Sequence, residues 1–129
     1  MTMLLLDSQA LLWLLDDSPR LGPLARTAIT DATRVYVSAA TVWELTIKAM
    51  LGKLVIPARL SDRILAQGLF LMAVTAEDAE GIRDFPELAK HDPFDRLIVA
   101  QAANARLQLV TADRVLLTLD RNVLIDASK

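Results

Sequence analysis

Short apolar runs, each followed by polar residues and then by a segment of helical spacing, are the feature that most constrains the fold of this chain. The first run, Met-Leu-Leu-Leu, ends at Asp7, after which apolar residues recur every three or four positions. Runs that are apolar throughout are typical of parallel strands covered on both faces by helices. We therefore expect a three-layer α/β/α domain around a parallel sheet. The expected strands are residues 3–6, 35–37, 69–74, 107–111 and, more weakly, 123–125.

Helices are expected between these strands, with recognisable capping residues at their ends. Gly22-Pro23 begins one helix, Thr75 begins another through a capping-box pattern, and Gly52 ends a third. Phe85-Pro86 interrupts the chain before the longest helix. The expected helices cover about residues 8–15, 23–32, 39–51, 60–67, 76–83, 93–106 and 113–119.

Length and composition limit the organisation of the molecule. The 129 residues suit a single domain, 1–129, with one continuous fold. The chain is 53% hydrophobic, with a mean hydropathy of +0.36, which is apolar for a small domain. We therefore expect an oligomer in which a partner subunit covers part of this apolar surface.

Membrane, secreted and strongly basic proteins are not indicated. Residues 4–15 are interrupted by Asp7 and lack the flanks of a membrane span or a signal peptide. Cysteine is absent, which removes disulfides and thiol chemistry, so we expect a cytoplasmic protein with no membrane partner. A net charge of −2 argues against coating nucleic acid by charge alone, so any nucleic-acid contact must be local.

The segment from His91 to Arg96 begins the longest expected helix with two carboxylates. Pro93 suits the first helical position, which makes Asp92 the N-cap and Asp95 the third helical residue. Capping explains Asp92 fully. One cap is sufficient, so Asp95 is left for another role.

Four acids share one expected position, the carboxyl edge of the sheet, where ligands of such folds bind. Asp7 and Asp113 follow strands, Glu44 lies in an apolar helix, and Asp95 lies in a first helical turn. Simpler roles remain open for each. Asp7 and Asp113 could be helix caps, with Ser8 competing beside Asp7, and Glu44 could form an i, i+4 salt bridge with Lys48.

A divalent cation would reconcile several carboxylates at one place, because like charges repel when they lack a counter-charge. Mg²⁺ and Mn²⁺ prefer oxygen ligands and substrate phosphate. A single histidine and no cysteine make zinc improbable. Mg²⁺ or Mn²⁺ is the expected cofactor.

Four blocks of the chain, in order, resemble the acidic blocks of PIN-domain ribonucleases and, more narrowly, of the VapC toxins of toxin–antitoxin pairs. Each block contains one of the four acids, and the combination is more specific than any single block. Ser8 stands where the family commonly has threonine, which keeps the hydroxyl. The blocks are residues 4–13, 38–45, 92–102 and 110–113.

The resemblance implies a PIN-like sheet with strand order 3-2-1-4-5 and Mg²⁺- or Mn²⁺-dependent endonucleolytic cleavage of RNA. It also implies a homodimer that a cognate VapB-type antitoxin inhibits. Under this hypothesis Asp7 and Asp95 bind metal directly. Glu44 binds metal through water or orients the attacking water, and Asp113 holds a metal-bound water or completes a second site.

Other polar and aromatic residues receive weaker assignments. Ser8 and Thr111 either orient the carboxylates or cap helices. Lys48 and Arg96 either contact RNA phosphate or form salt bridges and solvated surface.

Histidine and tryptophan are not expected at the catalytic centre. We assign His91 a surface or packing role, because metal-activated hydrolysis needs no imidazole. Trp13 and Trp43 are assigned to the core or a dimer interface, because both lie among apolar residues at helical spacing.

Two other functions remain as alternatives. A response-regulator receiver has similar length and an acidic Mg²⁺ pocket, but Asp7 is single in its block and no Lys lies near Val123-Leu124. A PIN-like module that binds RNA or a protein partner without catalysis would be expected to have lost one or more acids. All four acids are present.

Overall fold

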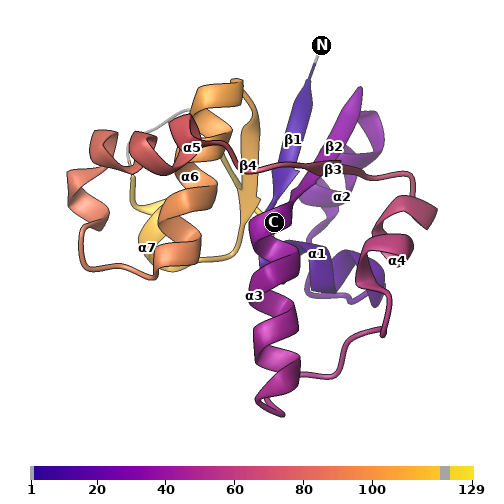
Figure 1. Ribbon diagram of the computed structural model, residues 1–129. Coiled ribbons are helices and arrows are strands. Elements are labelled where there is room, and N and C mark those ends of the chain that lie inside the picture. The colour runs from indigo at the N-terminus through magenta and orange to yellow at the C-terminus, as the bar shows by residue number, and fades with distance from the viewer. Residues whose placement is uncertain (1, 120–122) are drawn as a thin grey trace.

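The computed structural model describes residues 2–119 and 123–129, which form a five-stranded parallel sheet between two layers of helices (Figure 1). The strand order is β3-β2-β1-β4-β5, which confirms the order implied by the family resemblance. The strands are β1 (Met3–Leu6), β2 (Arg34–Ser38), β3 (Phe70–Met72), β4 (Gln108–Thr111) and β5 (Leu124–Asp126).

Helices cover both faces of the sheet. One apolar core joins the sheet to α1, α2, α3 and α4, and a second joins it to α6, α7 and the 3₁₀ turns (Figure 1). The helices are α1 (Ser8–Leu15), α2 (Pro23–Asp31), α3 (Ala39–Met50), α4 (Leu60–Ala66), α5 (Ala76–Glu80), α6 (Pro93–Ala105) and α7 (Arg114–Leu117), with 3₁₀ turns at Gly81–Asp84 and Pro86–Leu88.

Strand β1 lies at the centre of the sheet, which explains its continuous apolar sequence. Leu4 and Leu6 belong to one core and Leu5 to the other, and all three side chains are fully buried. β1 pairs with β2 on one side and β4 on the other. The residues that follow β1 and β4 are therefore neighbours at the carboxyl edge of the sheet.

Capping side chains place most helix starts where the sequence predicts them. Asp7, Ser38, Asp92 and Asp113 are the N-caps of α1, α3, α6 and α7, and each accepts a backbone N–H of its helix. Thr75 forms a reciprocal capping box with Asp78. These caps fix the positions from which the acidic side chains emerge.

Three elements are clearly shorter than the sequence predicts, and one of them is α7, which covers Arg114–Leu117. The third strand covers only Phe70–Met72, because it is an edge strand that pairs on one side with β2. The helix after Thr75 ends at Glu80 and continues as 3₁₀ turns towards Pro86. Across residues 2–119 and 123–129, none of the helices has the length and apolar character needed to cross a membrane.

The end of the chain packs against the start of α2. Gly22 donates its N–H to the carbonyl of Ala127 at 2.9 Å, and the N–H of Leu24 donates to the carbonyl of Lys129 at 2.7 Å. A Cβ atom on Gly22 would lie 2.3 to 2.5 Å from backbone atoms of Lys129. This approach is closer than any side chain tolerates.

Replacing Gly22 with Ala is therefore expected to lower the free energy of unfolding by about 1 to 3 kcal/mol, measured by urea denaturation. The cost arises from displacement of residues 127–129 and loss of their hydrogen bonds. The same substitution in a chain lacking Ser128 and Lys129 should cost much less, because the clash is absent. Equal costs in both chains would contradict this explanation.

Candidate functional site

A cavity of about 720 Å³ opens at the carboxyl ends of β1 and β4. All four acids singled out in the sequence line it, which brings together residues from four separate segments of the chain. Its charged lining consists of the acids Asp7, Glu44, Asp92, Asp95 and Asp113 and the cations Lys48, Lys53 and Arg114.

Asp7 is the most deeply placed of these carboxylates. One oxygen accepts the N–H of Ala10 at 2.7 Å, and the other accepts the hydroxyl of Thr111 at 2.5 Å. Its side chain is thus both the cap of α1 and a wall of the cavity. Burial raises the pKa of Asp7 above its ordinary value, against the lowering effect of these hydrogen bonds.

Asp113 is held by the start of α7. Its Oδ1 accepts the N–H groups of Val115 and Leu116 at 2.8 and 3.0 Å, which leaves Oδ2 directed towards His91. Burial alone would raise the pKa of Asp113. The Leu116 N–H and the nearby His91 ring outweigh burial and lower that pKa below its ordinary value.

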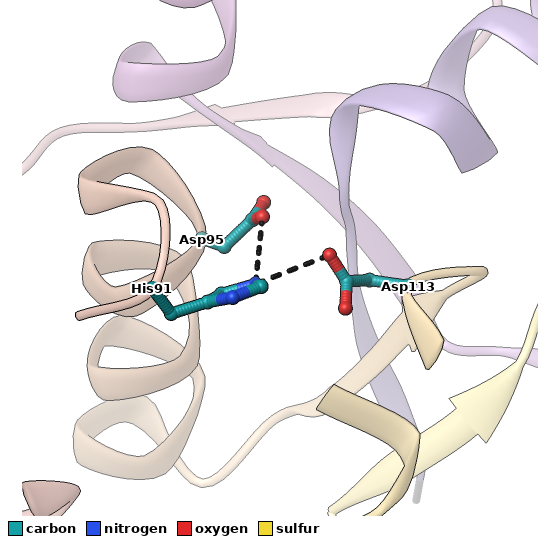
Figure 2. Close-up of side chains that lie close together, drawn as sticks. All are labelled: His91, Asp95 and Asp113. Carbon is teal, nitrogen blue, oxygen red and sulfur yellow. Dashed lines mark hydrogen bonds and ion pairs between the residues drawn. The ribbon is translucent and has the colours of Figure 1, made fainter. Parts of the chain in front are cut away.

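Asp95 and Asp113 both point toward the same nitrogen of the His91 ring (Figure 2). The Nε2 atom of His91 is 3.3 Å from Oδ2 of Asp95 and 3.2 Å from Oδ2 of Asp113. One potential ligand atom from each of the three residues lies within 4.8 Å of the others. Among the described residues, this group is the one whose spacing suits a single metal ion.

The pKa of Asp95 is strongly raised in the cavity. Burial first, and then the charges of Asp92, Asp113 and Glu44, raise the pKa of Asp95 to about 7. The cations and the His91 ring therefore do not balance the carboxylates. This excess of negative charge contributes to the raised pKa of Asp95.

Glu44 projects from α3 into the same cavity and is only 6% exposed. Its Oε1 accepts the hydroxyl of Ser8, and its Oε2 pairs with Lys48 at 2.9 Å. The salt bridge left open by the sequence is therefore present. The hydrogen bond from Lys48 to Glu44 raises the pKa of Lys48, so this lysine stays charged.

The capping roles left open for Asp7 and Asp113 are also present, and they coexist with a place in the cavity. Ser8 does not compete as the cap of α1, since its hydroxyl donates to Glu44. Asp95 does not complete a capping box with Asp92. Its N–H donates to the Asp92 side chain, while its own carboxylate faces His91.

His91 is placed differently from its sequence assignment. A surface or packing role was expected, yet its Nε2 faces Oδ2 of both Asp95 and Asp113, two of the predicted site acids. Trp43 was assigned to the core or a dimer interface. It is not a core residue, because 61% of it is exposed and its ring packs edge-on against Phe94, with ring centres 5.2 Å apart, so the dimer interface stays a prediction for this residue. Trp13 is partly buried and packs against the first core, as expected.

Lys48 and Arg96 occupy different environments. Lys48 lines the cavity beside Glu44. Arg96 is not among the residues that line the cavity, and its Nη1 donates to the carbonyl of Ala89 at 3.0 Å. Of these two cations, only Lys48 is placed to meet a ligand in the cavity.

A family model described as "PIN domain" matches residues 4–122, so the chain belongs to the PIN-domain family. Among curated proteins, the chain is 34% identical over 116 residues to Ribonuclease VapC22 of Mycobacterium tuberculosis. That match covers 88% of this chain and 89% of the relative. The family model spans the segments that hold all four acids.

Solved structures support the fold independently. The chain resembles VapBC2 from Rickettsia felis, crystallised with a DNA fragment from its promoter, with a TM-score of 0.69, 13% identity and coverage of 96% and 98% of the two chains. It also resembles DNA-bound VapBC from Salmonella typhimurium, with a TM-score of 0.67, 18% identity and 98% coverage of both chains. These likenesses show that the three-layer architecture is that of known toxin–antitoxin structures.

Proposed function

We propose that this chain is a VapC-type toxin, an endoribonuclease that uses Mg²⁺ or Mn²⁺ to cleave RNA phosphodiester bonds. The observation that carries the proposal is the convergence of Asp7, Glu44, Asp95 and Asp113 on one cavity. The PIN family model covers the segment that holds all four residues, and the relative named as a ribonuclease matches 88% of the chain.

The charge balance of the cavity fits a divalent cation. The pKa of Asp95 is raised to about 7 first by burial and then by the charges of neighbouring carboxylates, which repel its ionised form. A bound cation would remove that repulsion and let Asp95 ionise fully. The donor set is dominated by carboxylate oxygens, which are the ligands that Mg²⁺ and Mn²⁺ prefer.

We propose that Asp95 and Asp113, which belong to the group with metal-ligand spacing, hold the ion together with Asp7, which lines the same cavity outside that group. Thr111 and the N–H of Ala10 fix the orientation of the Asp7 carboxylate, and the start of α7 fixes that of Asp113. Such outer hydrogen bonds set ligand geometry in metal sites. Thr111 is therefore proposed as a positioning residue.

We propose that Glu44 orients the water that attacks the phosphate. The hydrogen bond from Ser8 and the ion pair with Lys48 fix the orientation of the Glu44 carboxylate at the wall of the cavity. Lys48, Lys53 and Arg114 line the cavity and are placed to attract RNA phosphate. The bound ion would supply polarisation of the phosphoryl oxygens and a lowered pKa of water.

A cognate antitoxin of the VapB type is the proposed regulatory partner. The solved relatives are described as toxin–antitoxin complexes, and an acidic cavity suits an inserted Arg or Lys from an inhibitor.

A homodimer is proposed in addition, because large apolar side chains are exposed on several elements. The most exposed of them are Leu24, Trp43, Met50, Leu51 and Val55.

The experiment that tests the function is cleavage of single-stranded RNA by tag-free protein. We expect cleavage with Mg²⁺ or Mn²⁺, complete loss with EDTA, and recovery when excess metal is returned. A protein that binds RNA without cutting it in either metal would favour the non-catalytic alternative. Cleavage that persists in EDTA would contradict a metal-dependent mechanism.

A further inference from the structure

His91 places a nitrogen atom beside two carboxylates of the proposed metal site, where only oxygen ligands were expected. The residue lies in the turn before α6, and its N–H donates to the carbonyl of Leu88 at 2.9 Å. Its side chain is 20% exposed, and Nε2 faces both Asp95 and Asp113 (Figure 2). The turn therefore places His91 beside the site, and the ring reaches both carboxylates from there.

The two distances from the His91 nitrogen to the carboxylate oxygens are close to those between adjacent ligands of an octahedral ion, and all three atoms lie within 4.8 Å of one another. Metal–ligand bonds of 2.0 to 2.1 Å hold adjacent ligands about 3 Å apart. Nε2 is 3.2 Å from Oδ2 of Asp113 and 3.3 Å from Oδ2 of Asp95. Small side-chain movements would bring all three atoms onto one ion.

The alternative role for the ring is to donate a hydrogen bond from Nε2 to the carboxylates in the metal-free site and to move away when a metal ion binds. The two roles differ in tautomer. A donor carries its proton on Nε2, whereas a ligand carries it on Nδ1 and offers the Nε2 lone pair. The ligand role is favoured because Nε2 lies within 3.3 Å of an oxygen of each carboxylate, so a single ion can meet all three atoms.

We propose that His91 is a nitrogen ligand of the metal ion and makes the site select Mn²⁺ over Mg²⁺. This inference rests on the proposed function and adds a specificity-determining residue to it. Mg²⁺ strongly prefers oxygen ligands, whereas imidazole is a common ligand of first-row transition ions. Replacing one oxygen by nitrogen therefore weakens Mg²⁺ binding relative to Mn²⁺.

Pulsed electron paramagnetic resonance of bound Mn²⁺ tests the ligand directly. His91 is the only histidine in the chain, so in tag-free protein a directly coordinated imidazole nitrogen can come only from this residue. We expect strong ¹⁴N modulation in the native chain and its loss in His91→Gln, whose amide oxygen replaces the nitrogen. Bound Mn²⁺ without coordinated nitrogen in the native chain would overturn the inference, whatever the variant does.

Calorimetric titration with Mn²⁺ and Mg²⁺ tests selectivity. The ratio of Mn²⁺ to Mg²⁺ affinity is expected to fall at least about tenfold in His91→Gln. An unchanged ratio would overturn the selectivity, and a gain in affinity for both ions would assign the ring the role of a displaced donor. Both results leave the proposed function standing, whereas failure of the native chain to bind either ion would overturn the function and this inference together.

Discussion

RNA cleavage is expected to fall by roughly 100-fold or more when Asp7 is replaced by Asn, with the fold retained. Asn is a favoured helix N-cap and can still accept the N–H of Ala10, so α1 keeps its start. The substitution removes the buried negative charge that we propose binds the metal. Stability should change little, because the lost hydrogen bond to Thr111 is offset by relief from burying a carboxylate.

The matched control is Asp31→Asn, which makes the same chemical change at an exposed residue outside the cavity. Cleavage of labelled single-stranded RNA and thermal unfolding should be measured for both variants. Asp31→Asn is expected to behave like the native chain. Full cleavage activity in folded Asp7→Asn protein would exclude Asp7 as a metal ligand.

Replacing Asp95 with Asn is expected to abolish metal binding and yet to stabilise the metal-free protein at pH 8. The pKa of Asp95 rises from 3.8 to about 7 on folding. A raised carboxyl pKa means that the folded state holds the proton more tightly. Below pH 4 the carboxyl is protonated in both states, and ionisation of Asp95 costs no stability. Between pH 4 and 7 the free energy of unfolding falls as pH rises, and above pH 7 the full penalty is present.

Asn carries no charge to penalise, so the variant should gain about 1 to 2 kcal/mol at pH 8 and much less at pH 5, after allowance for solvent screening. Urea denaturation in EDTA at both pH values measures the difference. Addition of Mn²⁺ should stabilise the native chain but not the variant. A variant that is less stable than the native chain at pH 8 in EDTA would refute this account of the charge balance.

The sequence predicts the fold well where local chemistry decides it. Apolar runs identify the strands, and Asp7, Ser38 and Asp92 identify helix starts because capping depends on neighbouring residues. The strand order came from the family resemblance, since local patterns do not specify which strands pair. The short third strand was overestimated because Leu69 is buried without belonging to the strand.

The site was predicted incompletely for a reason that lies in tertiary structure. Asp7 and Asp113 follow central strands, so topology alone brings them together. The place of His91 depends on a turn through Leu88 and on the distance to Asp113, which is 22 residues away in the chain. The available signal was its spacing of four residues from Asp95, across the helix cap.

The core alternative for Trp43 was wrong for a related reason. Its neighbours in the sequence are apolar, but it lies on the outer side of α3, where it contacts Phe94. Helical spacing identifies a face of a helix. It does not tell which face the rest of the protein covers.

Anomalous diffraction from crystals soaked in Mn²⁺ tests the central claim most directly, because it locates the ion without relying on activity. Our account predicts an anomalous peak in the cavity, bound by carboxylate oxygens of Asp7, Asp95 and Asp113. Loss of that peak in Asp95→Asn crystals would agree with the account. A fully occupied ion elsewhere on the protein, with no peak at these carboxylates, would contradict it.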